Sequence, residues 1–393
     1  MRILIAGQTY YPETNGQAVF TTHLAEGLAQ RGHTVWVLTP AHAPRRYTEY
    51  INRVRVERFT SVPLTPMYRS VRVTPFARHP VHRATQALRP HVVHIQDHYF
   101  ISRAAVTAAK RRYIPLLGTN HFLPENLMRN MPWPLNKGSL VERILWLTML
   151  NVYNRLDLVT TPTETAATIL RGQGIIPPVH AVSCGVDLSI FHPMPEMDCR
   201  KTWSHFGLTN DTITFLFVGR VDGEKRLDVL LRALKIVNRA DIRVVIAGKG
   251  FHMAELKELA RRLGISHQVH FLGYVPFADL PRLLHCAHVF VMPSEAELQS
   301  IATLEAMATG KPVIGARARA LPELIHHGEN GYLFRPGDPE DLARYMIKML
   351  QEQDRWPLMG AASMHIAHRH SLDRTITTYE RLYQELQTAS SPS

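Results

Sequence analysis

The sequence predicts an α/β protein of two domains, each a doubly wound parallel sheet with helices on its faces. Three observations predict this fold class. The chain has 393 residues, more than a single hydrophobic core usually supports. Short β-branched segments alternate with segments of helical periodicity, which is the order typical of parallel sheets. The alternation starts again after His180, as expected for a second sheet of the same kind.

The first forty residues predict a strand, a turn, a helix and a second strand. Ile3 to Ala6 is apolar, and a proline interrupts Tyr10 to Gly16. Apolar residues then recur at helical spacing from Phe20 to Leu28, before a second apolar strand at Thr34 to Leu38. Such a unit implies parallel strand pairing. Further strands of this half are expected at Val92 to Ile95, Pro115 to Gly118 and Leu158 to Thr161.

The second half repeats this pattern. Strands are expected at Ile213 to Val218, Arg243 to Ala247, Val269 to Leu272 and Val289 to Met292, with helices at Leu227 to Val237 and Met253 to Leu263. A glycine and two prolines interrupt the periodicity at Cys184 to Pro195. We therefore expect an N-terminal domain over 1–187, a C-terminal domain over 188–370, and a helix within 371–393 packing back toward the first domain. Parallel sheets bind ligands at the carboxyl ends of their strands, so the expected site is a cleft between the domains.

The cysteines and the first residues indicate in which cellular compartment the protein is expected. Cys184, Cys199 and Cys286 are too few and too scattered for a disulfide framework, and no CxxC pair predicts a metal site. They favour a reducing cytosol. The apolar run at the start ends at Gly7, too early for a signal peptide or a membrane span. We therefore expect a cytoplasmic protein.

The net charge of +12 is concentrated in one part of the chain. Between Arg31 and Arg143, 18 Lys and Arg residues stand against five acidic residues. Such a region can bind nucleic acid, an anionic membrane or a phosphorylated acceptor, or simply form a solvated basic face. Apolar residues lie among the basic ones, as in enzymes that rest on anionic leaflets, unless they belong to the core. They are Val62, Leu64, Met67, Tyr68, Phe76, Met128, Met131, Trp133, Leu135, Ile144, Leu145, Trp146 and Leu147.

The most informative segment is PSEAELQSIATLEAMATGKP, at Pro293 to Pro312. Glu297 and Glu305 are eight residues apart, a little over two helical turns, and a glycine and a proline end the helix. If the helix begins near Gln299, Glu297 lies in the preceding loop and Glu305 on the helix. A loop carboxylate beside a helix N-terminus can bind sugar hydroxyls, while the helix end attracts phosphates.

This segment resembles the signature of the retaining GT-B glycosyltransferases of family 4, two glutamates with seven residues between them and AMA-x-G-x-P after the second. The matching residues are Glu297, Glu305, Ala306, Met307, Ala308, Gly310 and Pro312. The resemblance covers nearly the whole chain. It implies a GT-B fold of two Rossmann-like domains facing across a cleft. It also implies transfer of a sugar from a nucleoside diphosphate to an acceptor with retained anomeric configuration.

The resemblance implies roles for further residues. Arg220 and Lys225 match the cations that hold the donor diphosphate, Glu297 the carboxylate at the sugar, and Glu305 the carboxylate at the ribose. His121 matches a position near the reacting centre, where it would bind the transferred sugar or the acceptor hydroxyl. The alternative is a structural histidine. The expected donor-binding residues are Gly16, Gly219, Gly248, Val275, Gln299, Ser300, Ile301 and Glu305.

The chain departs from many family members directly after Glu297, where Gly-Phe-Gly is replaced by Leu298, Gln299 and Ser300. Gln299 could contact a sugar hydroxyl itself, so the donor sugar cannot be carried over. UDP-linked glucose is the first expectation, and mannose or another hexose remains open. No DxD-like cluster stands in a metal-holding context, so neither a metal nor another cofactor is expected, and side-chain cations would stabilise the leaving group.

The expected acceptor is a membrane lipid. The basic and apolar pattern, with Asn120 to Glu125, is similar to bacterial enzymes that glycosylate diacylglycerol, which implies a peripheral protein on the inner face of the cell membrane. A soluble or polysaccharide acceptor is the alternative. A nucleic-acid-binding protein would explain the basic face but not the paired glutamates, and no RRM or zinc-finger motif occurs, so no nucleic acid partner is expected. An inactive nucleotide-sugar sensor is disfavoured because every expected class of donor residue is present.

Overall fold

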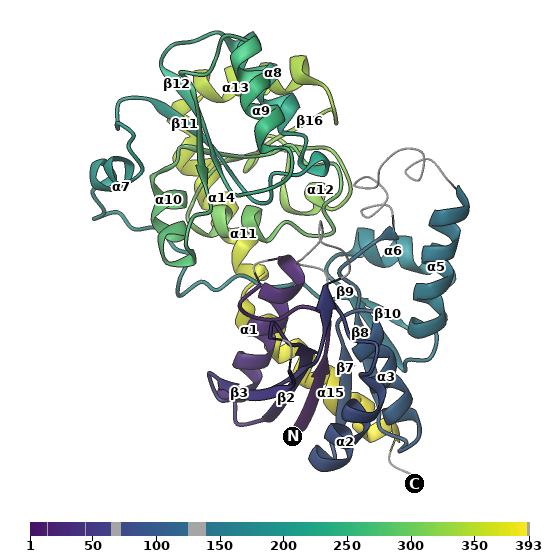
Figure 1. Cartoon of the computed structure of the whole chain (residues 1–393). Helices are drawn as coiled ribbons and strands as arrows, with labels where there is room; N and C mark the ends of the chain where they lie inside the picture. Colours follow the sequence, from purple (N-terminus) through teal and green to yellow (C-terminus); the bar gives the residue numbers. More distant parts are fainter. Residues whose placement is uncertain (14, 44, 64–71, 125–138, 391–393) are drawn as a thin grey trace. The chain divides into compact units, whose positions relative to one another are not determined.

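The computed structural model describes residues 1–13, 15–43, 45–63, 72–124 and 139–390. These residues form two compact units (Figure 1). Unit 1 comprises the described residues up to Cys184 together with those from Leu372 onward, and unit 2 comprises Gly185–Ser371. The chain therefore leaves unit 1, builds unit 2, and returns to unit 1 with its last helix.

Unit 1 is built on an eight-stranded sheet of strand order β10-β9-β8-β7-β1-β2-β4-β3. The strands are β1 (Arg2–Ala6), β2 (Thr34–Pro40), β3 (Tyr47–Ile51), β4 (Val54–Phe59), β7 (Val92–Ile95), β8 (Leu116–Thr119), β9 (Leu158–Thr161) and β10 (Val179–Ala181). Only β3 pairs in an antiparallel sense in this sheet. Two short strands, β5 (Val62–Pro63) and β6 (Arg72–Val73), pair with each other. The described helices are α1 (Gly16–Gln30), α2 (Arg78–Leu88), α3 (Phe100–Lys110), α5 (Ser139–Tyr153), α6 (Glu164–Gly172) and α15 (Leu372–Ser390).

Helices α1 and α15 pack together in unit 1 (Figure 1). The side chain of Asn15 accepts a hydrogen bond from the amide of Ala18 and so caps α1. Phe20 of α1 is buried, as are Tyr379 and Tyr383 of α15. Burial of such large side chains on both helices makes α15 part of the core of unit 1 rather than an appendage.

Unit 2 is built on a six-stranded parallel sheet of order β13-β12-β11-β14-β15-β16. The strands are β11 (Ile213–Val218), β12 (Ile242–Ala247), β13 (Val269–Gly273), β14 (Val289–Met292), β15 (Val313–Ala316) and β16 (Gly331–Phe334). The helices are α7 (Cys199–His205), α8 (Leu227–Val237), α9 (Met253–Arg262), α10 (Leu280–Cys286), α11 (Ile301–Ala308), α12 (Leu321–Leu324), α13 (Pro339–Gln351) and α14 (Trp356–Arg369). A short 3-10 turn, η2 (Gly223–Lys225), follows β11.

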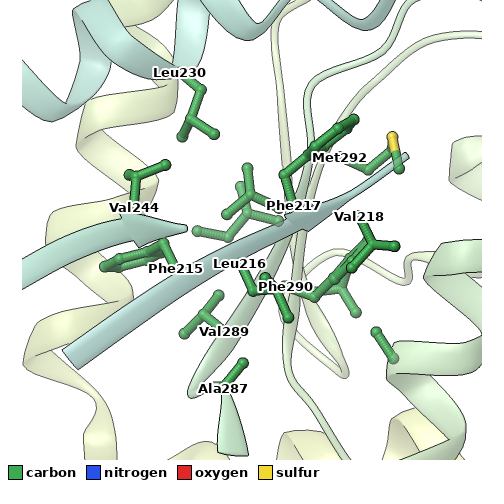
Figure 2. Packing of buried hydrophobic residues seen from close by; sticks show 14 of the residues in the cluster. Phe215, Leu216, Phe217, Val218, Leu230, Val244, Ala287, Val289, Phe290 and Met292 are labelled. Atoms are coloured by element: carbon green, nitrogen blue, oxygen red, sulfur yellow. The ribbon is translucent and has the colours of Figure 1, made fainter. Parts of the chain in front are cut away.

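The core of unit 2 lies on both faces of this sheet. Successive side chains of β11, from Phe215 to Val218, alternate between the two faces, and all are buried (Figure 2). Val289 and Phe290 of β14 lie beside Phe215 and Leu216 in the parallel register. A strand that is apolar on both faces needs helices on both sides. The predicted α/β class with parallel sheets is therefore confirmed.

One expectation about the cysteines is wrong. Cys199 in α7 and Cys286 in α10 form a disulfide, with their Cα atoms 5.3 Å apart, whereas Cys184 is buried and takes no part in this disulfide. The 87-residue separation of the pair concealed it, because α7 and α10 come into contact only when unit 2 folds. Disulfides are rare in reducing compartments, so the cysteine content no longer supports a reducing cytosol.

Several basic residues of unit 1 are paired with acids. The carboxylate of Glu57 is buried and accepts hydrogen bonds from Arg46 and Arg55. Arg58 is also buried, and its Nε lies 2.6 Å from Glu49 Oε1. Buried charges are stable only when paired in this way. Part of the positive charge of the sequence is therefore paired with acids inside unit 1 and does not form an open basic face.

Candidate functional site

The strand order of unit 2 indicates at which edge of its sheet a ligand would bind. Strand β11 lies between β12 and β14, so the connections on its two sides run in opposite directions. Open α/β sheets bind ligands at such a switch point, outside the carboxyl ends of the strands. Gly219 follows β11, Gly248 follows β12, and Glu297 lies in the segment after β14. Three residues predicted from the sequence are thus carried to the switch point of unit 2.

The two glycines bring the ends of β11 and β12 into direct contact. Gly219 and Gly248 have φ angles of +152° and +151°, which L side chains rarely adopt. A Cβ atom at Gly248 would lie 1.8 Å from the carbonyl oxygen of Gly219. The amide of Gly219 donates to the carbonyl of Ala247, and that of Gly248 to the carbonyl of Gly273. Only glycine therefore fits at position 248, and the backbone itself forms this part of the site.

The predicted cations lie beside these glycines and are paired with acids. Arg220 is half exposed and contacts the carboxylates of Asp222 and Glu224 at 2.5 and 2.6 Å. Lys225, at the end of η2, places its Nζ 2.5 Å from Glu297 Oε1. The Lys225 side chain is 14% exposed and that of Glu297 is 9% exposed. The structure thus brings Arg220, Lys225 and Glu297 into one charged cluster, joined by Glu224.

Helix α11 begins two residues later than its assumed start near Gln299. Ser300 is its N-cap, and the Ser300 hydroxyl accepts hydrogen bonds from the amide and the hydroxyl of Thr303. Ile301 is the first helical residue. Gln299 is buried. Glu297 lies in the loop before the helix, as expected, and its carbonyl oxygen accepts from the amide of Ala320.

Glu305 projects from the body of α11 into a buried environment. Burial raises the pKa of its carboxyl to about 8, because a carboxylate loses hydration there. The group is therefore largely protonated near neutral pH and can both donate and accept hydrogen bonds. Val275, which follows β13, is also buried. No group of three His, Cys, Asp or Glu side chains in the described part of the chain could hold a metal ion.

Two predicted residues belong to unit 1. Gly16 is the first residue of α1, and a Cβ atom there would meet nothing within 4 Å, so the space in front of its backbone is open. His121 comes shortly after β8 and is half buried. Its Nε2 lies 2.9 Å from Gln96 Oε1, and burial lowers the pKa of the ring to about 3. His121 is therefore neutral at physiological pH and carries a single ring proton.

Gln96 and Asp97, which directly follow β7, are not among the site residues predicted from the sequence. Asp97 Oδ2 accepts from the amide of Gln8 at 2.5 Å and from the side chain of Gln17 at 3.0 Å. It thereby connects the loop after β1 to α1 and β7. The available signal was the polar pair directly after a buried strand, since strand ends carry the ligand sites of parallel sheets.

Comparisons with known proteins agree with this geometry. A family model described as Glycosyltransferase Family 4 matches residues 14–190, and one described as Glycosyl transferases group 1 matches residues 201–362. A D-inositol 3-phosphate glycosyltransferase of Thermobispora bispora is 30% identical over 306 residues, which cover 74% of this chain and 70% of the relative. The chain belongs to the family 4 glycosyltransferases.

Two further comparisons concern its relatives and its fold. The glycosyltransferase is 24% identical over 359 residues to an alpha-monoglucosyldiacylglycerol synthase of Streptococcus pneumoniae, covering 89% of this chain and 78% of that one. The solved structure of Anabaena HepE in complex with UDP-glucose matches with a TM-score of 0.80 and 20% identity, over 98% of this chain and 100% of HepE. The predicted GT-B fold and the enzyme class are thereby confirmed.

Proposed function

We propose that this glycosyltransferase moves glucose from UDP-glucose to a membrane lipid such as diacylglycerol and retains the anomeric configuration. The observation that carries the donor half is the cluster of Arg220, Lys225 and Glu297 at the switch point of unit 2. It combines two cations for a diphosphate with a carboxylate for sugar hydroxyls. The complex of HepE with UDP-glucose and the name of the pneumococcal synthase support glucose as the sugar.

The proposed reaction breaks the bond between the anomeric carbon and the diphosphate oxygen. Positive charge grows on the sugar ring, and the bonding electron pair leaves with the diphosphate. Arg220 and Lys225 stabilise that leaving charge, as preorganised cations do in closed sites. The acceptor hydroxyl attacks the same face of the sugar, and its proton passes to the departing diphosphate oxygen. Glu297 and His121 would orient the sugar and the acceptor hydroxyl.

The observation that favours a lipid acceptor is an apolar stripe on α5. Leu140, Ile144 and Leu147 are 68%, 50% and 56% exposed and recur at helical spacing on one face. Trp146 and Met149 of the same helix are buried. A helix with one face in the core and a second apolar face in water suits contact with the interface of a membrane. We call these three residues the α5 stripe.

The other apolar residues that lie among basic residues in the sequence differ in their exposure to solvent. Val62 and Phe76 are exposed, whereas Trp146 belongs to the core and Leu145 is half buried. Seven others lie outside the described residues, namely Leu64, Met67, Tyr68, Met128, Met131, Trp133 and Leu135. Among the described residues, no helix has the length and apolar character needed to cross a bilayer.

A soluble phosphorylated acceptor is the second candidate. The Thermobispora relative is named for D-inositol 3-phosphate, and a net charge of +12 would favour an anionic acceptor as well as an anionic membrane. The lipid acceptor and the soluble phosphorylated acceptor would use the same donor, but only the lipid acceptor requires a membrane surface. Transfer assays that offer both acceptors therefore decide between them.

The test compares vesicle binding with transfer. Sedimentation with neutral and anionic vesicles at low and high salt should show binding to anionic lipid that weakens as salt rises. Replacing Leu140, Ile144 and Leu147 together by Ser should abolish that binding and transfer of labelled glucose to diacylglycerol, while affinity for UDP stays. The matched control replaces three exposed apolar residues of unit 2, Ile236, Ile347 and Leu358, by Ser.

Two results would contradict the proposal in different ways. If the enzyme did not bind anionic vesicles at low salt and transferred glucose efficiently to D-inositol 3-phosphate, the proposed lipid acceptor would be wrong. The proposed donor would be unaffected. If no UDP-sugar bound in calorimetry, the donor assignment itself would be wrong.

A further inference from the structure

A chain of buried hydrogen bonds in unit 1 leads from His121 to the C-terminal helix α15. His121 Nε2 lies 2.9 Å from Gln96 Oε1, and Gln96 Nε2 lies 3.1 Å from His94 Nε2. His94 Nδ1 in turn lies 2.8 Å from the hydroxyl of Tyr383. Thr119 Oγ1 lies 2.7 Å from His94 Nε2. The chain thus joins a candidate substrate contact to a residue more than 260 positions later in the sequence.

Burial makes this chain sensitive to the position of each proton. His94 and Tyr383 are fully buried, and Gln96 is almost so. Burial also holds the pKa of both histidines far below the ordinary value, so each ring is neutral and carries one proton. A buried donor facing a donor, or an acceptor facing an acceptor, is costly because water cannot replace the lost hydrogen bond. The protons must therefore be arranged consistently along the whole chain.

The amide of Gln96 determines that arrangement. Its oxygen only accepts, so His121 donates from Nε2 and leaves Nδ1 without a proton. Its nitrogen only donates, so His94 Nε2 accepts and His94 carries its proton on Nδ1. That proton is donated to the hydroxyl oxygen of Tyr383, while Thr119 Oγ1 competes with Gln96 for the single lone pair of His94 Nε2. Each contact on the path from His121 through Gln96 and His94 to Tyr383 then joins a donor to an acceptor.

We infer that Tyr383 is a positioning residue for catalysis, which acts through His94 and Gln96 to keep the proton of His121 on Nε2. His121 Nδ1 is then a fixed acceptor for a hydroxyl of the transferred sugar or of the acceptor. This inference rests on the proposed role of His121 in the transfer reaction. The ring centroids of Phe20 and His121 are 4.8 Å apart, and this contact helps to hold the His121 ring in place.

Removal of the Tyr383 hydroxyl has a defined consequence. Without it, His94 Nδ1–H has lost its acceptor, and the His94 proton is better placed on Nε2, where Thr119 Oγ1 accepts it. The amide of Gln96 must then turn over, because its N–H cannot donate to a protonated nitrogen. Gln96 would donate to His121 Nε2, and the proton of His121 would move to Nδ1. A substitution on α15 would thereby change the substrate-facing atom of His121 from an acceptor to a donor.

The test uses the full-length protein with ¹⁵N-labelled histidine. Long-range ¹H–¹⁵N spectra report which ring nitrogen carries the proton, and the signals of His121 are assigned by their loss in His121→Gln. In Tyr383→Phe we expect the proton of His121 to move from Nε2 to Nδ1. We expect kcat to fall roughly threefold to tenfold, the effect of one hydrogen bond, with little change in KM for UDP-glucose.

Two further variants guard against a general effect on folding. Tyr153→Phe removes another buried hydroxyl of unit 1, one that donates to the carbonyl of Thr119 at 3.0 Å, and should leave the His121 signals and kcat unchanged. Gln96→Met keeps the volume of the side chain but interrupts the chain of hydrogen bonds next to His121. In this variant the proton of His121 should no longer be held on Nε2, and the measurement can be made even if Tyr383→Phe does not fold.

The outcomes separate this inference from the proposed function. Unchanged His121 signals in both Tyr383→Phe and Gln96→Met would overturn the inference. A shifted proton with unchanged kcat would support the hydrogen-bonded chain but overturn its role in catalysis, and with it the role of His121. Equal effects of Tyr153→Phe and Tyr383→Phe on the His121 signals would also overturn it.

Discussion

Lys225 and Glu297 are 72 residues apart in the sequence and form an ion pair in which Nζ lies 2.5 Å from Oε1. Lys225 ends the turn after β11, and Glu297 lies in the loop after β14. The pair therefore joins two neighbouring strand ends of unit 2. Both side chains are largely shielded from water, which strengthens their attraction.

The first prediction concerns the two cations. Arg220→Ala and Lys225→Ala should each lower kcat by a factor of roughly 30 to 1,000, since a group that stabilises developing charge counts for about 2 to 4 kcal/mol. Arg261→Ala, which removes an exposed arginine paired with Glu258, is the control. Steady-state kinetics, with circular dichroism as a check on folding, provide the measurement. Near-normal turnover in both variants would refute the assignment of the diphosphate contacts.

The second prediction separates the two glutamates. Glu305→Ala should weaken binding of UDP itself, because the family resemblance assigns this residue to the ribose. Glu297→Ala should leave UDP affinity nearly unchanged and lower the rate of glucose transfer. Calorimetric titration of both variants with UDP tests this, with the exposed Glu255→Ala as the control. Equal loss of UDP affinity in both would contradict the division of roles.

The third prediction follows from the raised pKa of Glu305. The native state keeps this proton up to about pH 8, whereas an ordinary glutamic acid loses it near 4.5. Between these values the native state binds more protons than the unfolded chain, so stability from this group falls as pH rises, by about 1.4 kcal/mol per pH unit. Urea unfolding across this range should show the decline in the wild type relative to Glu305→Gln. Parallel pH dependence in the two proteins would show that the native carboxyl is ionised.

The fourth prediction concerns Gly248. An alanine there would place Cβ 1.8 Å from the carbonyl oxygen of Gly219 at a φ of +151°. We expect Gly248→Ala to destabilise the protein by at least about 2 kcal/mol and to weaken UDP binding, because the ends of β11 and β12 must separate. Gly172→Ala, where a Cβ meets nothing within 4 Å, should be nearly neutral. Thermal unfolding of both variants would check this, and equal melting temperatures would argue against the close contact.

Much of the fold could be predicted because buried parallel strands have a simple pattern. The expected strands at Val92 to Ile95, Leu158 to Thr161, Ile213 to Val218 and Val289 to Met292 agree with the structure at every residue. The β3–β4 hairpin was missed because Arg55, Glu57 and Arg58 interrupt the apolar pattern of β4. Those charges are acceptable in a strand only because Arg46 and Glu49 supply partners, which no local pattern shows.

The residues of the candidate site could be proposed from the sequence for a similar reason. Gly219 and Gly248 directly follow recognisable strands, Arg220 comes next after Gly219, and Glu297 and Glu305 belong to a recognisable motif. The partners of these residues were not predictable, because each contact depends on the folded structure. Tyr383 lies 289 residues from His94, and nothing in the sequence of α15 shows that this tyrosine contacts a histidine.

The return of α15 to unit 1 bears on the order in which the protein matures during its synthesis. Most of unit 1 precedes unit 2 in the sequence, but Tyr379 and Tyr383 of its core follow unit 2. Unit 2 is complete in sequence at Ser371, so it can close while unit 1 still lacks a helix. Domains usually fold from the N-terminus onward during translation. In this enzyme the segment of unit 1 that precedes unit 2 therefore lacks the packing of α15 until unit 2 has been synthesised.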